Sequence, residues 1–432
     1  MRSPGITGGR CIIFSEEVME LRDRLIERFI KYALVPTQSD GSKDTVPSSE
    51  GQWVLAKMLM EELAGLGAED IHLSEYCVLT ARFPADEKHA HSPAVGWVVH
   101  LDTADIGMSG RVSPVLVRNY GGGDILQDPE GRQKISVREH PELEKYIGDD
   151  ILVSDGTSVL GADDKAAIAN VMCALETLVT QKLPHGDIYV AFVPDEEIGL
   201  RGAGRLELSR FPVDWGYTID CCELGEVAYR TFNAASAQVD ITGINAHPMS
   251  AKNVMVNAVS VAVDIISGLD PDAVPEKTEG TEGFMYVTSL EGSVSSARIG
   301  LNIRDHDRIL FDEKKRALAE ACERAGEKHP GARISLAVSD TYSNIEDSLM
   351  GKDRTCVDHI FRAMDELGIA PKDIAMRGGT DGSLLSAKGI PVPNYFTGAH
   401  NFHSLAEFLP VSSFEASARL TLKLIALCCG EK

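Results

Sequence analysis

The stretch Gly161-Ala162-Asp163-Asp164-Lys165 places two adjacent carboxylates at the junction between a short apolar run and a helical pattern. The apolar run covers residues 151–153, and apolar side chains at helical spacing follow from Ala166. Neighbouring carboxylates repel each other and must be solvated or neutralised. A solvated acidic loop would meet that need, and so would bound cations. The sharper hypothesis is that Asp163 is a metal ligand whose carboxylate is shared by two ions.

Three further apolar runs, each typical of a buried strand, end in acidic residues or a histidine. Residues 94–99 precede His100 and Asp102, residues 188–193 precede Glu196 and Glu197, and residues 215–219 precede Asp220. The runs alternate with helical patterns, which predicts an α/β sheet. Ligands of open α/β sheets bind at the carboxyl ends of the strands. The pattern therefore favours a ligand site at that edge.

The segment after residue 229 has a different pattern. Strand and helix signals follow one another in the order β-α-β-β-α-β, which predicts a ferredoxin-like α+β unit of roughly 110 residues. Long helices and a glycine-rich turn return afterwards, so this unit is expected to be an insertion. The predicted division is a disordered extension at 1–20, one domain formed by 21–230 and 346–432, and the inserted domain at 231–345.

Composition narrows the classes of partner. The chain has 432 residues and a net charge of -23, so its surface repels the phosphates of nucleic acids and anionic lipid headgroups. No apolar run approaches the ~20 residues that span a bilayer. The first ten residues are followed by an apolar run too short for a signal peptide. Nine cysteines without a regular framework fit reduced thiols. We expect a cytoplasmic protein that binds neither nucleic acid nor membranes.

A histidine near the C-terminus, His403, adds a second imidazole to the strand-end residues. A site for two zinc ions uses imidazole and carboxylate ligands, with one carboxylate between ions ~3.5–4 Å apart. Taken singly, each residue is better explained without a metal, because strand-end histidines are commonly structural and Glu-Glu pairs are commonly solvated. Only their joint occurrence favours a metal site.

Several motifs in order along the chain carry a resemblance to a known family. They are Leu-Gly-Ala-Asp-Asp-Lys at 160–165, His-Leu-Asp-Thr at 100–103, Pro-Asp-Glu-Glu-Ile-Gly at 194–199, Tyr-Thr-Ile-Asp at 217–220, Arg-Gly-Gly-Thr-Asp-Gly at 377–382, and shorter matches at 47–53, 232–236 and 303–305. Together they resemble the peptidase T family, the tripeptide aminopeptidases among the two-zinc exopeptidases. The likeness covers nearly the whole chain.

The resemblance implies a fold and a set of metal ligands. The fold would be a zinc-exopeptidase-type mixed sheet flanked by helices, with the inserted domain as a lid. Asp163 would bridge two Zn²⁺ ions, for which Co²⁺ or Mn²⁺ could substitute. His100 and Asp220 would bind one ion, and Glu197 and His403 the other. Because the aminopeptidases of this group carry Asp at the position of Asp220, that residue favours an aminopeptidase.

The remaining roles implied by the resemblance concern catalysis and substrate. Asp102 would hold the imidazole of His100 in its ligating tautomer, and Glu196 would be the general base that activates a metal-bridging water. His247 in the lid would support the tetrahedral oxyanion. Arg304 and Arg377 would grip the C-terminal carboxylate of a short peptide. Without the resemblance, a capped loop histidine and surface arginines would be the better interpretation.

The sequence departs from the family pattern at three places, none of which removes a ligand or the base. They are Cys221-Cys222-Glu223 in place of a glycine run, Met249-Ser250 in place of Gly-Thr, and Ser404-Leu405-Ala406, where a basic residue is missing. The runner-up function is a dinuclear-zinc amidohydrolase or carboxypeptidase acting on dipeptides or N-acyl amino acids. A third hypothesis is a non-catalytic binding protein on a degenerate peptidase fold. Monomer and homodimer both stay open.

Overall fold

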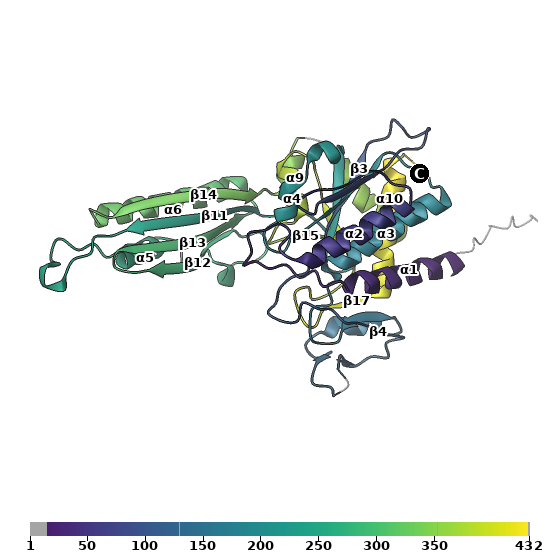
Figure 1. The fold of residues 1–432 in the computed structure, drawn as a ribbon, viewed down its shortest axis with the longest axis horizontal. Coiled ribbons are helices and arrows are strands. Elements are labelled where there is room, and N and C mark those ends of the chain that lie inside the picture. Colours follow the sequence, from purple (N-terminus) through teal and green to yellow (C-terminus); the bar gives the residue numbers. More distant parts are fainter. Residues whose placement is uncertain (1–14, 129, 352, 431–432) are drawn as a thin grey trace, which may run out of the picture.

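The computed structural model describes residues 15–128, 130–351 and 353–430. Most of the extension predicted at 1–20 lies outside these residues, and the first helix, α1, spans Ser15–Ala33. Figure 1 shows a large sheet-and-helix unit from which a second, elongated unit projects on one side. Among the described residues, no helix has both the length and the apolar character that a membrane span requires.

The largest sheet has eight strands. In chain order they are β1 (Glu69–Leu73), β2 (Leu79–Phe83), β3 (Val95–His100), β8 (Ile188–Val193), β9 (Trp215–Cys221), β10 (Glu226–Arg230), β15 (Lys372–Ala375) and β16 (Asn394–Phe396). Their order across the sheet is β1-β2-β8-β3-β9-β16-β10-β15. The central strands β8, β3 and β9 are parallel to one another, whereas β2 pairs antiparallel with β8 and β16 pairs antiparallel with β10. The sheet is therefore mixed.

Helices cover both faces of this sheet. On one face lie α1, α2 (Glu50–Gly65), α3 (Ala162–Gln181), α8 (Thr355–Leu367) and α10 (Val411–Cys428), and on the other α4 (Arg201–Arg205), the 3-10 turn η2 (Leu208–Arg210) and α9 (Asp381–Ala387). The position of β3 between two layers of helices explains why its sequence is apolar throughout. Trp97 and Val99 enter the core beneath the long helices, and Val98 enters the second core. The predicted α/β sheet flanked by helices is confirmed.

A small group of strands lies beside the main unit (Figure 1). It contains β4 (Pro114–Val117), β5 (Ile125–Leu126), β6 (Lys134–Ile135), the 3-10 helix η1 (Pro141–Tyr146), β7 (Ile151–Ser154) and β17 (Phe408–Pro410). Strands β17, β7 and β4 form one sheet, and β5 pairs with β6. The apolar run before Asp163 is β7, so it belongs to this small sheet and not to the eight-stranded one.

The projecting unit has the predicted β-α-β-β-α-β order. Its elements are β11 (Asn233–Thr242), the turn η3 (Pro248–Ser250), α5 (Ala258–Ser267), the turn η4 (Pro275–Lys277), β12 (Phe284–Gly292), β13 (Ser296–Asp305), α6 (Arg308–Lys328) and β14 (Arg333–Tyr342). The strands form an antiparallel sheet in the order β12-β13-β11-β14. Alternate residues of β13, such as Ile299 and Leu301, face the helices, which gives the unit a core of its own. The chain then returns through α7 (Ile345–Leu349), which packs on α9 and β10.

Candidate metal centre

The structure gathers the predicted ligands at one edge of the main sheet. Because β8, β3 and β9 are parallel neighbours, their carboxyl ends meet at this edge. Each side chain comes from one of these ends, from the first turn of α3 or from the loop between β16 and β17. His100 ends β3, Glu196 and Glu197 follow β8, and Asp220 lies in β9. Asp163 is the second residue of α3, and His403 lies in the loop.

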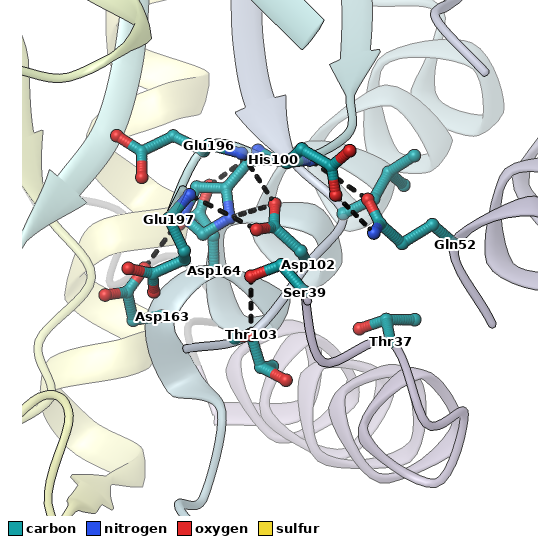
Figure 2. A network of polar contacts seen from close by, with 12 residues as sticks. Thr37, Ser39, Gln52, His100, Asp102, Thr103, Asp163, Asp164, Glu196 and Glu197 are labelled. Atoms are coloured by element: carbon teal, nitrogen blue, oxygen red, sulfur yellow. Dashed lines mark hydrogen bonds and ion pairs between the residues drawn. The ribbon is translucent and has the colours of Figure 1, made fainter. Parts of the chain in front are cut away.

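The carboxylate of Asp163 contacts two imidazoles, one on each oxygen. His100 Nε2 lies 2.8 Å from Oδ1, and His403 Nε2 lies 3.0 Å from Oδ2. His403 Nε2 also lies 2.9 Å from Glu197 Oε1. Asp163 is 7% exposed, so the shared carboxylate is buried, whereas the His403 side chain is 49% exposed. Figure 2 shows Asp163 beside Glu197 and below His100. One carboxylate between two imidazoles is the arrangement expected of a bridging ligand.

Two groups of side chains have donor atoms close enough to hold an ion. His100, Asp163, Asp164 and Asp220 form one group, and Asp163, Glu197 and His403 form the other, with all donor atoms of a group within 4.8 Å of one another. Asp163 belongs to both. Imidazole nitrogens and carboxylate oxygens are the donors that Zn²⁺ and similar divalent ions accept. The residues present therefore fit a pair of metal ions that share one ligand.

Asp102 connects the imidazole to the loop that carries both glutamates. It is fully buried, and its Oδ1 lies 3.4 Å from His100 Nδ1. The same carboxylate accepts the backbone N–H of Glu196 at 2.9 Å and that of Glu197 at 3.2 Å. The predicted contact between Asp102 and His100 is therefore present in the structure. Asp102 also orients the turn after β8, which the sequence did not suggest.

A second buried carboxylate, Asp195, supports this turn from the other side. It accepts hydrogen bonds from the Ser48 backbone N–H (2.7 Å), the Ser48 hydroxyl (2.6 Å) and the Gln52 amide (2.7 Å). Its backbone is left-handed, with φ of 54°. A residue other than glycine in that conformation must be held there by its surroundings. These hydrogen bonds keep Asp195 in that conformation, and Figure 2 shows Gln52, one of the donors.

Glu196 lies beside the ligands without belonging to either group of donors. In Figure 2 its carboxylate points away from Asp102, while that of Glu197 lies near Asp163. Burial, followed by the nearby carboxylate of Asp220, raises the pKa of Glu196 well above its ordinary range. A carboxylate in such surroundings binds a proton readily, as a general base must. This placement fits the predicted roles, in which Glu197 binds a metal ion and Glu196 stays free to act as the base.

The charges of the predicted metal ligands depend on one another. Hydrogen bonds that His403 donates to Asp163 and Glu197 raise its pKa to about 11. Burial raises the pKa of Glu197 to about 7. Burial also acts to raise the pKa of Asp163, but the hydrogen bonds with His100 and His403 outweigh it and lower that pKa. The site therefore concentrates negative charge that is compensated by its imidazoles.

Four residues at this centre were not predicted. Asp164 is fully buried and accepts the His100 backbone N–H at 3.1 Å, and Lys165 is buried with its ammonium donating to the Leu101 carbonyl at 2.9 Å and to the Thr37 hydroxyl. Both lie within two residues of Asp163, so their position in the sequence was a usable signal. The other two, Glu407 and Asp381, are distant in sequence. Glu407 binds the turn at 161–163, and Asp381 is 2% exposed with a carboxylate oxygen that has no hydrogen-bond partner.

The three predicted substrate residues are not gathered at this centre. His247 is exposed, and its Nδ1 accepts the Met249 backbone N–H of its own turn at 3.2 Å. Arg304 Nη1 donates to the carbonyls of Ala235 (3.1 Å) and Ile303 (2.9 Å), and its guanidinium stacks on a tyrosine of β14. That tyrosine, Tyr342, is close enough to Glu196 for its pKa to be raised, after burial, by that carboxylate. Arg304 is thus connected to the surroundings of the base through Tyr342.

Arg377 lies in the sheet-and-helix unit, but its guanidinium is hydrogen-bonded to the projecting unit. Its Nη1 donates to the carbonyls of Gly280 (3.2 Å) and Glu282 (2.9 Å), and its Nη2 donates to the Thr278 hydroxyl (2.7 Å). The guanidinium carbon also lies 5.3 Å from each of the ring centres of Phe232 and Phe284. These contacts join the segment after β15 to the loop before β12. In this arrangement Arg377 connects the two units.

Comparison with known proteins agrees with this picture. A model of the peptidase family M20/M25/M40 matches residues 160–427. A Peptidase T-like protein of Yersinia pestis is 51% identical over 401 residues, covering 93% of this chain and 97% of that protein. Peptidase T of Geobacillus kaustophilus is 40% identical over 408 residues, covering 94% and 98%. The crystal structure of aminopeptidase PepT from Bacillus cereus shares the fold, with a TM-score of 0.72 at 22% identity, covering 94% and 98%.

The fold and these matches define the class of protein as a metallopeptidase. The chain belongs to the peptidase family M20/M25/M40. Its relatives within that family are peptidase T and a peptidase T-like protein, so the predicted resemblance to the peptidase T family is confirmed. The predicted zinc-exopeptidase-type fold with an inserted α+β unit is confirmed as well.

Proposed function

We propose that this chain is a metal-dependent aminopeptidase that releases the N-terminal residue from tripeptides, using two Zn²⁺ ions. The observation that carries the proposal is the position of Asp163, whose two oxygens each contact one imidazole, at 2.8 and 3.0 Å. The names of the relatives support the peptidase T type. His100 and Asp220 would hold one ion, Glu197 and His403 the other, and Asp163 both.

The chain's own residues divide the work of hydrolysis. When bound, the ions polarise the peptide carbonyl and favour deprotonation of water. Glu196 takes the proton of the attacking water, whose oxygen bonds to the carbonyl carbon, and delivers that proton to the amine as the C–N bond breaks. Asp102 keeps the His100 imidazole oriented so that Nε2 faces Asp163. His100 must be neutral in order to bind a metal.

The projecting unit, with bounds near 231–345, would act as a lid that selects peptides by their length. Arg304 would bind the C-terminal carboxylate, since the contacts of its Nη1 and its stacking on Tyr342 leave other guanidinium donors for a ligand. His247 would support the oxyanion only if it is brought to the site from its present exposed position. Arg377 would serve the substrate indirectly, through its bonds to the lid.

The cellular setting is part of the proposal. Short peptides are the expected partners. A cytoplasmic location fits nine cysteines that lack a disulfide framework.

A substrate panel tests the reaction. Purified protein supplied with Zn²⁺ should release free alanine from Ala-Ala-Ala and should lose most of that rate on N-acetyl-Ala-Ala-Ala. An unchanged rate on the blocked peptide would contradict an aminopeptidase. Turnover of N-acetyl amino acids or dipeptides without turnover of tripeptides would instead favour an amidohydrolase or carboxypeptidase on the same metal site.

A further inference from the structure

The loop between β16 and β17 does more than present His403. Its last residue, Glu407, is 1% exposed and has no counter-ion among its hydrogen-bond partners. Glu407 Oε2 accepts the backbone N–H of Gly161 at 2.9 Å. Oε1 accepts that of Ala162 at 2.8 Å and, more weakly, that of Asp163 at 3.3 Å. One carboxylate thus binds three successive amides of the turn that carries the shared ligand.

The turn itself depends on such a partner. Gly161 has φ of 72°, and a Cβ at that position would lie 2.9 Å from Thr103 Cγ2, so the backbone there approaches its neighbours closely. The amides of residues 161–163 have no preceding helical turn to accept them. Without Glu407, three buried N–H groups would lose their acceptor, which is costly in a water-poor interior.

The same loop is also anchored to the small group of strands, on both sides of His403. Asn401 Nδ2 donates to Glu142 Oε1 at 3.0 Å, and Gln127 Nε2 donates to the Leu405 carbonyl at 2.8 Å. The loop backbone is left-handed at Asn401 and His403, with φ of 59° and 57°. His403 therefore sits between two fixed points, with its side chain 49% exposed.

We propose that Glu407 is a positioning residue that sets the distance between Asp163 and His403. This inference rests on the proposed function, because it assumes that these two residues hold a metal ion. Both oxygens of Glu407 are used by backbone amides, so it is not itself a ligand. Glu407 acts on Asp163 through the backbone of the turn, and on His403 through the three loop residues that lie between them.

The proposal predicts that loss of Glu407 changes the affinities for the two ions unequally. His100 and Asp220 lie at the ends of β3 and β9, and Glu407 contacts neither of them. Glu197 and His403, in contrast, depend on the loop for their contact at 2.9 Å. Loss of Glu407 should weaken the ion held by Glu197 and His403 more than the other. Partners that orient metal ligands typically change affinity by about 10- to 100-fold.

The experiment compares Glu407→Gln, Glu407→Asp and wild type. Glutamine keeps the shape but presents an NH₂ group to at least one amide N–H, and aspartate keeps the charge but is one methylene shorter. Protein stripped by a chelator is titrated with Co²⁺ and Zn²⁺ against a chromophoric competitor, and the Co²⁺ absorption spectrum is recorded. Glu415→Gln is the matched control, because Glu415 is also buried on the C-terminal segment but pairs with Arg419 at 2.6 Å.

The expected result is two ions per chain in wild type and in Glu415→Gln. In Glu407→Gln one ion should keep its affinity and the other should bind about 10- to 100-fold more weakly, with Glu407→Asp between. Excess metal should restore kcat on Ala-Ala-Ala, which a merely structural defect would not allow. If Glu407→Gln does not fold, the Asp variant carries the test.

Two outcomes overturn the proposal. The first is unchanged affinity for both ions in either folded Glu407 variant, and the second is an equal loss for both ions. The proposed function fails separately, if wild type binds two ions but turns over no tripeptide, or if it binds no second ion at all.

Discussion

The sheet-and-helix unit and the projecting unit differ in how they hold their functional side chains. In the first, residues from four separate stretches lie within hydrogen-bonding distance of one another, and buried carboxylates accept backbone N–H groups of the turns that carry the predicted ligands and base. In the second, one face of a four-stranded sheet packs on two helices, and the residues predicted to bind substrate remain in contact with their own unit. The comparison shows that the sheet-and-helix unit holds its metal-site residues in contact with one another. The substrate contacts of the projecting unit would instead depend on where that unit is placed as a lid.

The largest expected effect is at the metal site of the sheet-and-helix unit. Glu196→Gln should lower kcat on Ala-Ala-Ala by about 10²- to 10⁴-fold, because the base is lost, and it should retain its metal, because Glu196 belongs to neither donor group. Glu197→Gln is the control and should lose metal as well as activity. Elemental analysis alongside the assay separates the two. Full activity in Glu196→Gln would show that the base lies elsewhere.

The next effect separates the two arginines near the lid. Arg304→Ala should reduce kcat/KM on Ala-Ala-Ala by roughly 10- to 150-fold, the equivalent of about 1.5–3 kcal/mol for a charged hydrogen bond. It should hardly change the rate on the tripeptide amide. Arg377→Ala, which removes three bonds to the lid loop, should affect acid and amide alike. If Arg377→Ala also lowers the rate on the tripeptide acid but not on the amide, both arginines bind the C-terminal carboxylate.

A pH effect of intermediate size concerns the anchor of the His403 loop. His400 is 2% exposed, its Nε2 lies 2.7 Å from the Tyr146 hydroxyl, and burial lowers its pKa to about 4 from the ordinary histidine value of 6.5. Between these values the unfolded chain binds a proton that the folded chain does not, so His400 makes the folded state less stable as pH falls from 6.5 toward 4. The slope from this one group is at most about 1.4 kcal/mol per pH unit.

Chemical unfolding of wild type and His400→Gln at pH 7, 6 and 5 measures that slope. The variant should be less stable at pH 7 and should lose less stability on acidification. Parallel pH dependences for the two proteins would mean that His400 does not take up the proton. The groups whose charges also act on His400 are Glu223, Glu142, Lys145 and Lys372.

The smallest effect is expected on the surface of the projecting unit. Arg298 Nε pairs with Asp240 Oδ1 at 2.8 Å, but both side chains are about half exposed. Arg298→Ala should therefore lower the free energy of unfolding by less than about 1 kcal/mol and leave metal content unchanged. A loss of metal in this variant would contradict the separation of the two units. Unfolding curves and elemental analysis provide the two measurements.

Much of the main unit could be predicted from its sequence. Apolar runs that end in His100, Glu196 and Asp220 become parallel neighbours, so their carboxyl ends meet without further information. The β-α-β-β-α-β order of the projecting unit followed from its alternating pattern in the same way.

The role of Glu407 could not be predicted, because it depends on contacts between distant segments. Glu407 lies 244 to 246 residues from the amides it binds, and nothing in its local sequence marks it as an acceptor. The position of Arg377 against Phe232 and Phe284 likewise depends on how two folded units meet. Local patterns specify elements and strand ends, whereas these contacts exist only after the elements have packed.

The central claim is that the carboxylate of Asp163 is shared by two metal ions. Counting metal ions per chain in wild type, Asp163→Asn and Asp381→Asn tests it most directly, with circular dichroism to confirm folding. Asp381 is the matched control, since it is a buried carboxylate in the same charged surroundings but belongs to neither donor group. The account predicts two ions in wild type and in Asp381→Asn, and the loss of both tight sites in Asp163→Asn. Two tightly bound ions in a folded Asp163→Asn protein would contradict it.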